Sequence, residues 1–268
     1  MLQSPDLSTR YASKPIHFGN YPQSALRPVA LRSNIADIAR YLQIPFSSMQ
    51  QHDQELFQHM HYKSGHTIFS EGDKSDTLYL VNSGFTKSSL WDEFGHEQVV
   101  NFQMKGDILG VDGLHAGKHC SSVVALSDCD VILLPLAKLN TISKTYHVFE
   151  RALLNLVSVE LVFQQHRLCL LSAKNAEVRV ANFLLNLSGR FFKMGYSKSH
   201  FNLRMTRNDM GSYLGLKLET VSRALSLLDD SGLIEVRHRD ITICDEVGLR
   251  NLTVPKAKQK RVGQELTV

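Results

Sequence analysis

The spacing of apolar positions changes twice along this chain of 268 residues. From about residue 63 to 136, short apolar or alternating runs are separated by turn signals that contain glycine, as in an antiparallel barrel or roll. From about residue 146 to 172, apolar residues recur at steps of three and four, which predicts one long helix. Helical spacing of apolar residues returns after residue 175. It is followed by two short runs of alternating apolar and polar residues on either side of the charged turn Arg237-His238-Arg239-Asp240, which predicts a β-hairpin. The pattern therefore predicts an α+β fold with a β-rich first half.

The stretch 206–230 predicts two short helices around a break at Gly215, a residue that tolerates the backbone angles of a tight turn. Thr206 can cap the first helix, and Asp209 can return a hydrogen bond three positions on. The second helix has one apolar face, and its opposite face presents a carboxylate, a hydroxyl and a guanidinium, which belong to Glu219, Ser222 and Arg223. This arrangement is what reading DNA in the major groove requires.

These patterns divide the chain into five parts, and two domains are the natural expectation for this length. The expected parts are a flexible N-terminal extension (1–33), a sensor-like β-roll that opens with one or two short helices (34–145), a dimerisation helix (146–172), a winged helix-turn-helix DNA-binding domain (173–250) and a basic tail (251–268).

The long helix carries a seam typical of a coiled coil, with one polar member. Two copies of the chain can pair along it, and a helix-turn-helix protein usually reads two half-sites as a two-fold pair. A helix packed on its own barrel would show a similar pattern. The seam residues are Leu154, Val157, Leu161, Gln164, Leu168 and Leu171.

Charge separates the two ends of the chain. Residues 1–172 carry 14 Lys/Arg and 16 Asp/Glu, whereas residues 173–250 carry 12 and 9 and residues 251–268 carry 4 and 1. The excess positive charge lies with the two-helix unit and the tail, as expected if that end meets phosphates, although a basic solvated surface has the same asymmetry. No apolar run approaches about eighteen residues and the N-terminus has no signal pattern, so we expect a cytoplasmic protein without a membrane span. No Ser-His-Asp order, P-loop or paired carboxylates indicate an enzyme.

The order of the predicted parts, together with the stretches 170–191 and 205–225, resembles the CRP/FNR family of bacterial transcription regulators, and its FNR branch most closely. The resemblance spans roughly residues 44–245. The family reads double-stranded DNA with a Glu-x-x-Ser-Arg motif, which stands here as Glu219-Thr220-Val221-Ser222-Arg223. It implies that Arg223 donates to a guanine, that Glu219 accepts from an exocyclic amine and that Ser222 touches a neighbouring base. The same motif resembles the FNR-type reading of TTGAT half-sites in an inverted repeat, and the family resemblance implies that the homodimer expected from the long helix contacts RNA polymerase.

Residues that flank the reading face are candidates for phosphate contacts, and each is equally compatible with a solvated surface position. These candidates are Thr206, Arg207, Lys217, Thr220, Arg237 and Arg239.

The family's two best-known signals are not expected here. Cyclic-nucleotide-binding members have Gly-Glu-Leu and then Arg-Ser, whereas this chain has Val111 at the carboxylate position and no arginine between Arg40 and Arg151. A cyclic phosphate needs a charge-assisted partner, so the sequence argues against cyclic AMP. Iron–sulfur members place cysteines before Ile-Pro-Phe, but no cysteine precedes Cys120 in this chain, which argues against a cluster. We therefore predict no cofactor.

Smaller constellations leave alternatives open. Asp112, His115, His119 and Cys120 are metal-ligand types, but an exposed polar loop is the favoured interpretation and no metal site is predicted. Cys169 on the long helix is a candidate redox thiol, although a buried small side chain is its commoner role. The rival hypothesis is a ligand-sensing regulator whose barrel binds haem, a metal or a nucleotide.

Overall fold

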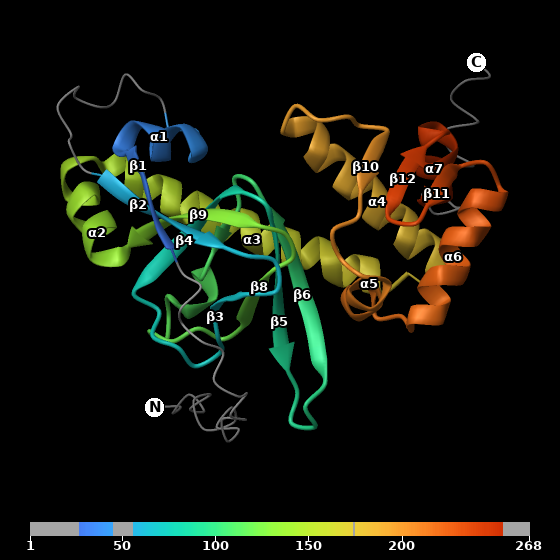
Figure 1. Cartoon of the computed structure of the whole chain (residues 1–268), viewed down its shortest axis with the longest axis horizontal. Helices are drawn as coiled ribbons and strands as arrows, with labels where there is room; N and C mark the ends of the chain where they lie inside the picture. Colours follow the sequence, from blue (N-terminus) through green and yellow to red (C-terminus); the bar gives the residue numbers. More distant parts are fainter. Residues whose placement is uncertain (1–26, 45–55, 174, 254–268) are drawn as a thin grey trace, which may run out of the picture.

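The computed structural model describes residues 27–44, 56–173 and 175–253. A β-roll lies at one end of the molecule and a helical domain with a small sheet at the other, with one long helix running between them (Figure 1). The expected α+β fold, with a β-roll followed by a winged helix-turn-helix, is confirmed.

Two antiparallel sheets form the β-roll, and apolar side chains alternate toward the space between them. The five-stranded sheet has the order β1 (Arg27–Asn34), β2 (Leu56–Tyr62), β9 (Cys129–Pro135), β4 (Thr77–Ser83), β7 (Ile108–Leu109). The four-stranded sheet has the order β3 (Thr67–Phe69), β8 (Ser122–Ala125), β5 (Phe85–Trp91), β6 (Glu97–Met104).

The expected N-terminal extension over 1–33 is wrong at its end. Arg27–Asn34 forms β1, which pairs antiparallel with β2, because Ser33 and its neighbours complete the edge of the sheet that β2 would otherwise leave open. The rest of the expected extension, 1–26, lies outside the described residues. Helix α1 (Ile35–Tyr41) follows directly, with Asn34 and Asp37 in a reciprocal capping box.

Helix α2 (Leu136–Thr145), which the sequence pattern did not reveal, leads from the β-roll into α3 (His147–Leu171). The bounds of α3 agree with the helix predicted over 146–172. It buries Phe149 and Ala152 against the β-roll but leaves most of its length uncovered within the single chain.

The C-terminal domain packs three helices over a small sheet, as the helix-turn-helix and wing patterns predict. Helix α4 (Ala176–Lys193) precedes α5 (Arg207–Leu214) and α6 (Leu218–Asp230), and the wing is the hairpin of β11 (Ile234–Arg237) and β12 (Asp240–Ile243). Two elements were not predicted. Strand β10 (His200–Asn202) adds to the wing through β12, and α7 (Glu246–Thr253) extends the domain into the first residues of the expected basic tail. Residues 254–268 lie outside the described part of the chain.

The hydrophobic core of the C-terminal domain does not stop at the domain boundary. Val99, Phe102 and Met104 of β6 join the same core cluster as Phe183 and Tyr213 from α4 and α5. Arg190 of α4 donates to the carbonyl of Phe102 at 2.8 Å. The β5–β6 hairpin therefore joins the β-roll to the helix-turn-helix by direct packing (Figure 1).

Candidate nucleic-acid interface

The turn between α5 and α6 is built by capping and close backbone approach. The Thr206 hydroxyl accepts from the amide of Asp209 at 3.0 Å, and the Asp209 carboxylate accepts from the amide of Thr206 at 2.9 Å, which confirms the predicted capping box. Gly215 ends α5 in the left-handed region at φ 62°, as its predicted turn requires. Gly211 is also constrained, because an added Cβ would lie 2.6 Å from the carbonyl oxygen of Leu216.

Arg179 of α4 stabilises this turn by hydrogen bonds to two backbone carbonyls. Its Nη1 donates to the carbonyl of Leu214 at 2.9 Å, and its Nε donates to the carbonyl of Ala173 at 2.8 Å. One guanidinium thus satisfies a free carbonyl at the end of α5 and holds it against the segment that follows α3.

Helix α6 has the two faces that its sequence predicts. Val221, Leu225 and Leu228 are buried, whereas Glu219 and Arg223 are exposed one turn apart. Neither exposed side chain has a hydrogen bond or ion pair within the described residues. Ser222 is half-buried, and its hydroxyl donates to the carbonyl of Leu218 at 3.1 Å. Two predicted reading residues are therefore free to bind an external partner, and the third must first give up a backbone bond.

The predicted phosphate contacts fall into different environments. Lys217 is exposed at the N-cap of α6, Thr220 is half-buried, and Thr206 is exposed although its hydroxyl is engaged in the cap. Arg237 is paired with Glu235, with 2.6 Å between Nη2 and Oε1, whereas Arg239 is exposed without a side-chain partner in the described part of the chain.

Arg207 is the most strongly positioned of these cations. Its Nη2 donates to the carbonyl of His238 in the wing at 2.9 Å, while its buried Nη1 has no partner among the described residues. Burial, and then the positive charge of Arg239, lower the pKa of the Arg207 guanidinium. It borders a hollow of about 260 Å³ that Ser222 and Val236 also line, between α6 and the wing. The carboxylate of Asp229 lines the same hollow, so an external anion here would meet a negative charge as well as the Arg207 guanidinium.

An ion cluster that the sequence pattern did not reveal links this unit to the β-roll. Lys87 of β5 donates to Asp209 at 2.8 Å, and its ammonium lies 2.9 Å from Glu97. Burial opposes both charges, but the hydrogen bonds outweigh it, so the pKa of Lys87 is raised and the pKa of Asp209 is lowered. Ser212 of α5 accepts from the amide of Val99 at 2.7 Å. Both halves of α5 are thus held by β5 and β6, through long-range contacts without a local sequence signal.

Inside the β-roll, the segment that corresponds to the family's nucleotide-binding stretch is closed on itself. The carboxylate of Asp112 accepts from the Ser121 hydroxyl at 2.7 Å and from the Cys120 amide at 3.1 Å. These donors would otherwise be available to a phosphate, which would meet a carboxylate instead. Val111, in the short 3-10 helix Val111–Gly113, offers no group for a ribose. The residues present do not fit a cyclic nucleotide.

Some of the candidate metal-ligand types in this stretch lie close together, since His119 Nδ1 is 3.7 Å from Asp112 Oδ1. His119 is buried and stacks on Phe69 with 3.7 Å between ring centroids, whereas His115 is exposed. Within the described ranges, no group of three or more His, Cys, Asp or Glu is placed to hold a metal ion.

A hydrogen-bond chain of Ser33, His59 and Asp130 has the connectivity of a hydrolase triad, although the sequence showed no such order. The Ser33 hydroxyl lies 2.9 Å from His59 Nε2, and His59 Nδ1 lies 2.7 Å from Asp130 Oδ2. Asn82 also donates to that carboxylate at 2.6 Å. The imidazole is 2% exposed and Ser33 is buried in β1, so the hydroxyl cannot reach a substrate. The chain joins β1, β2 and β9 and is structural.

Three of the four cysteines are exposed. Only Cys129 is buried among the four, all of which lie in the described ranges, while Cys120, Cys169 and Cys244 are exposed. The expectation that Cys169 is a buried small side chain is therefore wrong within the single chain, because α3 leaves that side uncovered.

Comparisons with known proteins match both domains. The family profile for the Crp-like helix-turn-helix domain matches residues 178–252, and the profile for the cyclic nucleotide-binding domain matches residues 59–146. The chain is 41% identical over 199 residues to the electron transport regulator A of Shewanella oneidensis, covering 74% of this chain and 79% of that protein. It is 39% identical over 190 residues to the fumarate and nitrate reduction regulatory protein of Escherichia coli, covering 71% and 76%.

A solved structure agrees with these relatives. FixK2 from Bradyrhizobium japonicum superposes with a TM-score of 0.68 at 30% sequence identity, covering 74% of this chain and 98% of that one. Within residues 27–44, 56–173 and 175–253, no helix is both long and apolar enough to cross a bilayer.

Proposed function

Because the chain belongs to the CRP/FNR family of DNA-binding transcription regulators, we propose that it reads an FNR-like inverted repeat of TTGAT-type half-sites as a homodimer. It is a regulator and not an enzyme. The observation that carries the proposal is the exposed pair of Glu219 and Arg223, which have no partner among the described residues, on a helix that buries Val221, Leu225 and Leu228 on its other face. A rigid support and free polar groups are what direct readout of bases requires.

Each reading residue has a chemical role. The Arg223 guanidinium presents two parallel donors, which match the O6 and N7 acceptors of a guanine. Glu219 is acceptor-only and suits the exocyclic amine of cytosine or adenine. Ser222, once released from the Leu218 carbonyl, donates to or touches a neighbouring base. Arg207, Arg239 and the other flanking cations position the protein on the phosphates.

The homodimer is supported by the uncovered seam of α3. Leu154, Leu161 and Leu168 are 66%, 59% and 66% exposed in the single chain, which is unusual for leucines aligned along one helix. Pairing two copies along this seam would bury them. Gln164, the polar member, donates to Glu160 at 2.6 Å on its own helix, so its amide is already partly satisfied.

We propose further that neither cyclic AMP nor an iron–sulfur cluster controls this regulator. Asp112 and Val111 leave no place for a cyclic phosphate and ribose, and no cysteine precedes Cys120. Contact with RNA polymerase is proposed from the family alone.

A DNA-binding measurement tests the proposal. Fluorescence anisotropy is recorded on a duplex with a TTGAT-type inverted repeat and on a scrambled duplex, for the wild type, Arg223→Ala and Arg250→Ala. Arg250 lies on α7 and has no role in reading, so it is the matched control. We expect wild type and control to prefer the repeat and Arg223→Ala to lose about tenfold to a hundredfold on it. Equal, weak binding of both duplexes by wild type and Arg223→Ala would refute base reading by α6.

The oligomeric state is measured separately by sedimentation velocity. We expect a dimer for the wild type and a monomer for the double variant Leu154→Asp, Leu161→Asp, because two buried carboxylates oppose pairing. Surface variants Glu150→Asp and Ser158→Asp serve as controls on the same helix. A double variant that stays dimeric would show that another surface pairs the chains.

A further inference from the structure

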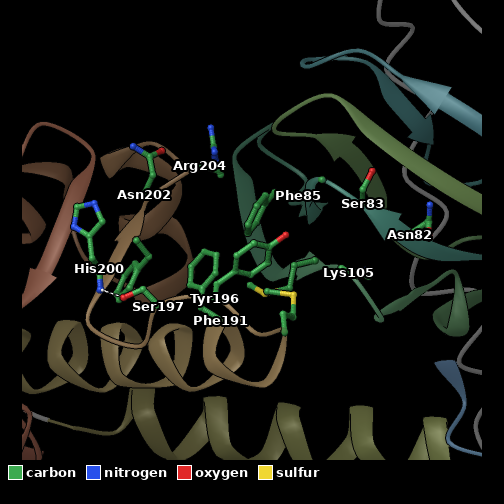
Figure 2. Close-up of a pocket in the computed structure, with 14 residues that line it drawn as sticks. Asn82, Ser83, Phe85, Lys105, Phe191, Tyr196, Ser197, His200, Asn202 and Arg204 are labelled. Carbon is green, nitrogen blue, oxygen red and sulfur yellow. Dashed lines mark hydrogen bonds between the residues drawn. The ribbon is translucent and has the colours of Figure 1, made fainter. Parts of the chain in front are cut away.

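A pocket of about 450 Å³ lies where the β-roll meets the C-terminal domain. Its apolar wall holds four aromatic rings, of which Phe85 comes from β5 and Phe191, Tyr196 and Phe201 come from the C-terminal domain. Figure 2 shows Phe85 facing Tyr196 and Phe191 across the junction, with Arg204 and Lys105 at the margins. The family's DNA-reading face and the interior of the β-roll are elsewhere in the molecule.

The aromatic wall is preorganised. Phe191 stacks on Phe201 with 5.3 Å between centroids and meets Tyr196 edge-on at 6.2 Å, while Phe85 lies 5.7 Å away. Phe191 and Phe201 are themselves buried and hold the wall in place before a ligand binds, so the ring surface that a ligand can contact belongs to Phe85 and Tyr196. Tyr196, by contrast, is 60% exposed and offers an uncovered ring at the mouth.

The charged side chains that line the pocket are all positive. None of its lining residues is an aspartate or glutamate, whereas Lys105 and Arg204 both contribute to it. Both cations are exposed, and neither has an ion pair within the residues that the structure describes. The Arg204 guanidinium lies 5.9 Å from the centre of the Phe85 ring, so positive charge stands directly beside the aromatic wall.

We propose that this pocket binds a small aromatic carboxylate, with its ring on the aromatic wall and its carboxylate toward Lys105 and Arg204. The volume suits a ligand of one or two fused rings, and pockets between domains are common ligand sites. Ring pairing favours an aromatic ligand over an aliphatic one, and a charge-assisted bond selects the anion. Since Lys105 belongs to the β-roll side and Arg204 to the C-terminal domain, the ligand bridges the two domains.

Isothermal titration calorimetry on the full chain without DNA tests this site. The probes are 2-naphthoate, its neutral analogue 2-naphthamide, and inorganic phosphate at matched ionic strength. We expect one naphthoate per chain at micromolar to submillimolar Kd, at least tenfold weaker binding of naphthamide, and no displacement of naphthoate by phosphate. Because no DNA is present, the outcome is independent of whether the reading proposal holds.

Variants locate the binding. We expect Lys105→Ala with Arg204→Ala to weaken naphthoate at least tenfold and Tyr196→Ala to weaken it about fivefold. The control pair Lys118→Ala with Arg250→Ala, which removes one lysine and one arginine outside the pocket, leaves the affinity unchanged. All five side chains are exposed, so folding is retained, and circular dichroism verifies it. Equal affinity for naphthoate and naphthamide, displacement by phosphate, no binding at millimolar concentration, or full affinity in the Lys105/Arg204 variant would each overturn the proposal.

Discussion

In the β-roll, Ser33, His59 and Asp130 hydrogen-bond to one another inside a sheet, whereas on α6 Glu219 and Arg223 point to solvent without a partner in the described residues. Both regions are rich in polar groups that can support chemistry. The difference is that the β-roll uses its groups internally and the helix-turn-helix leaves its groups available. A buried polar group must be satisfied within the protein, so a buried triad-like chain indicates structure, while an unpaired pair on a packed helix indicates recognition.

The same contrast appears in the anion sites. The Asp112 carboxylate accepts from the donors of Cys120 and Ser121 inside the β-roll, whereas Arg239, in the wing, is exposed without a side-chain partner among the described residues. The Asp112 segment of the β-roll therefore satisfies its own donors, whereas the C-terminal domain leaves a cationic side chain unpaired within the described residues.

The largest effect is expected where the β-roll depends on its internal polar chain. His59→Ala removes a partner of the Asp130 carboxylate in a buried setting and should lower the free energy of unfolding by about 3 kcal/mol. Ser33→Ala removes a neutral partner and should cost about 1 kcal/mol. Urea denaturation at pH 7 measures both, and hydrolysis of p-nitrophenyl acetate should be absent in the wild type. Hydrolysis that disappears in Ser33→Ala would contradict the structural role.

The next largest effect is expected at the junction between the regions. Lys87→Met leaves the Asp209 and Glu97 carboxylates without their shared cation and should lower the free energy of unfolding by about 2 kcal/mol. Lys144→Met, at an exposed lysine in the last turn of α2, is the control for removing a charge. A loss no greater than in the control would mean that the ion cluster does not stabilise the junction.

The same cluster predicts a pH dependence. The pKa of Asp209 is lowered in the folded protein, so its contribution is present above its unfolded pKa of about 4 and is lost as the pH falls through the folded value. The raised pKa of Lys87 makes its contribution present below about pH 10 and lost as the pH rises through its folded value. Stability measured between pH 3 and 6 should fall less steeply in Lys87→Met than in the wild type. Parallel curves would exclude Asp209 as a source of the acid sensitivity.

A smaller effect, on DNA affinity, is expected when Arg223 of α6 keeps its charge but loses its planar guanidinium. Arg223→Lys keeps the positive charge but loses the planar pair of donors, so affinity for the TTGAT-type repeat should fall about tenfold. Affinity for a duplex with that guanine replaced should change little, and anisotropy on the two duplexes gives the ratio. An unchanged ratio would mean that Arg223 contacts phosphate rather than a base.

The smallest effect distinguishes two neighbouring arginines of the wing. Arg239→Ala should weaken all duplexes alike by about threefold and reduce the salt slope of binding by about 1. Arg237→Ala should do less, because Glu235 already neutralises that guanidinium. Binding measured from 50 to 200 mM salt compares them, and a larger loss for Arg237→Ala would show that its ion pair breaks on DNA.

Much of the fold followed from local rules. The capping box of Thr206 and Asp209, the left-handed Gly215 and the apolar period of α6 are short-range features, so the sequence predicted the helix-turn-helix and its exposed face. Strand β1, helix α2 and strand β10 were missed because their apolar patterns are short and their stability comes from pairing with distant strands or packing on the sheet. Leu218 shares the three- and four-residue spacing of the buried Val221, Leu225 and Leu228, but it is 43% exposed because it begins α6 at the edge of the core.

By itself the sequence determined the helix-turn-helix over residues 206–230 and its exposed face, since helix caps, turns and periodic faces depend on neighbours a few residues apart. Only the tertiary structure decided which polar groups remain free. Lys87 meets Asp209, Asp112 meets Ser121, and Phe85 meets Phe191, across separations that no local pattern encodes. Whether a side chain binds a partner or stabilises the fold depends on what the folded chain places beside it, because a charge or hydroxyl already satisfied inside the protein gains little from an external ligand.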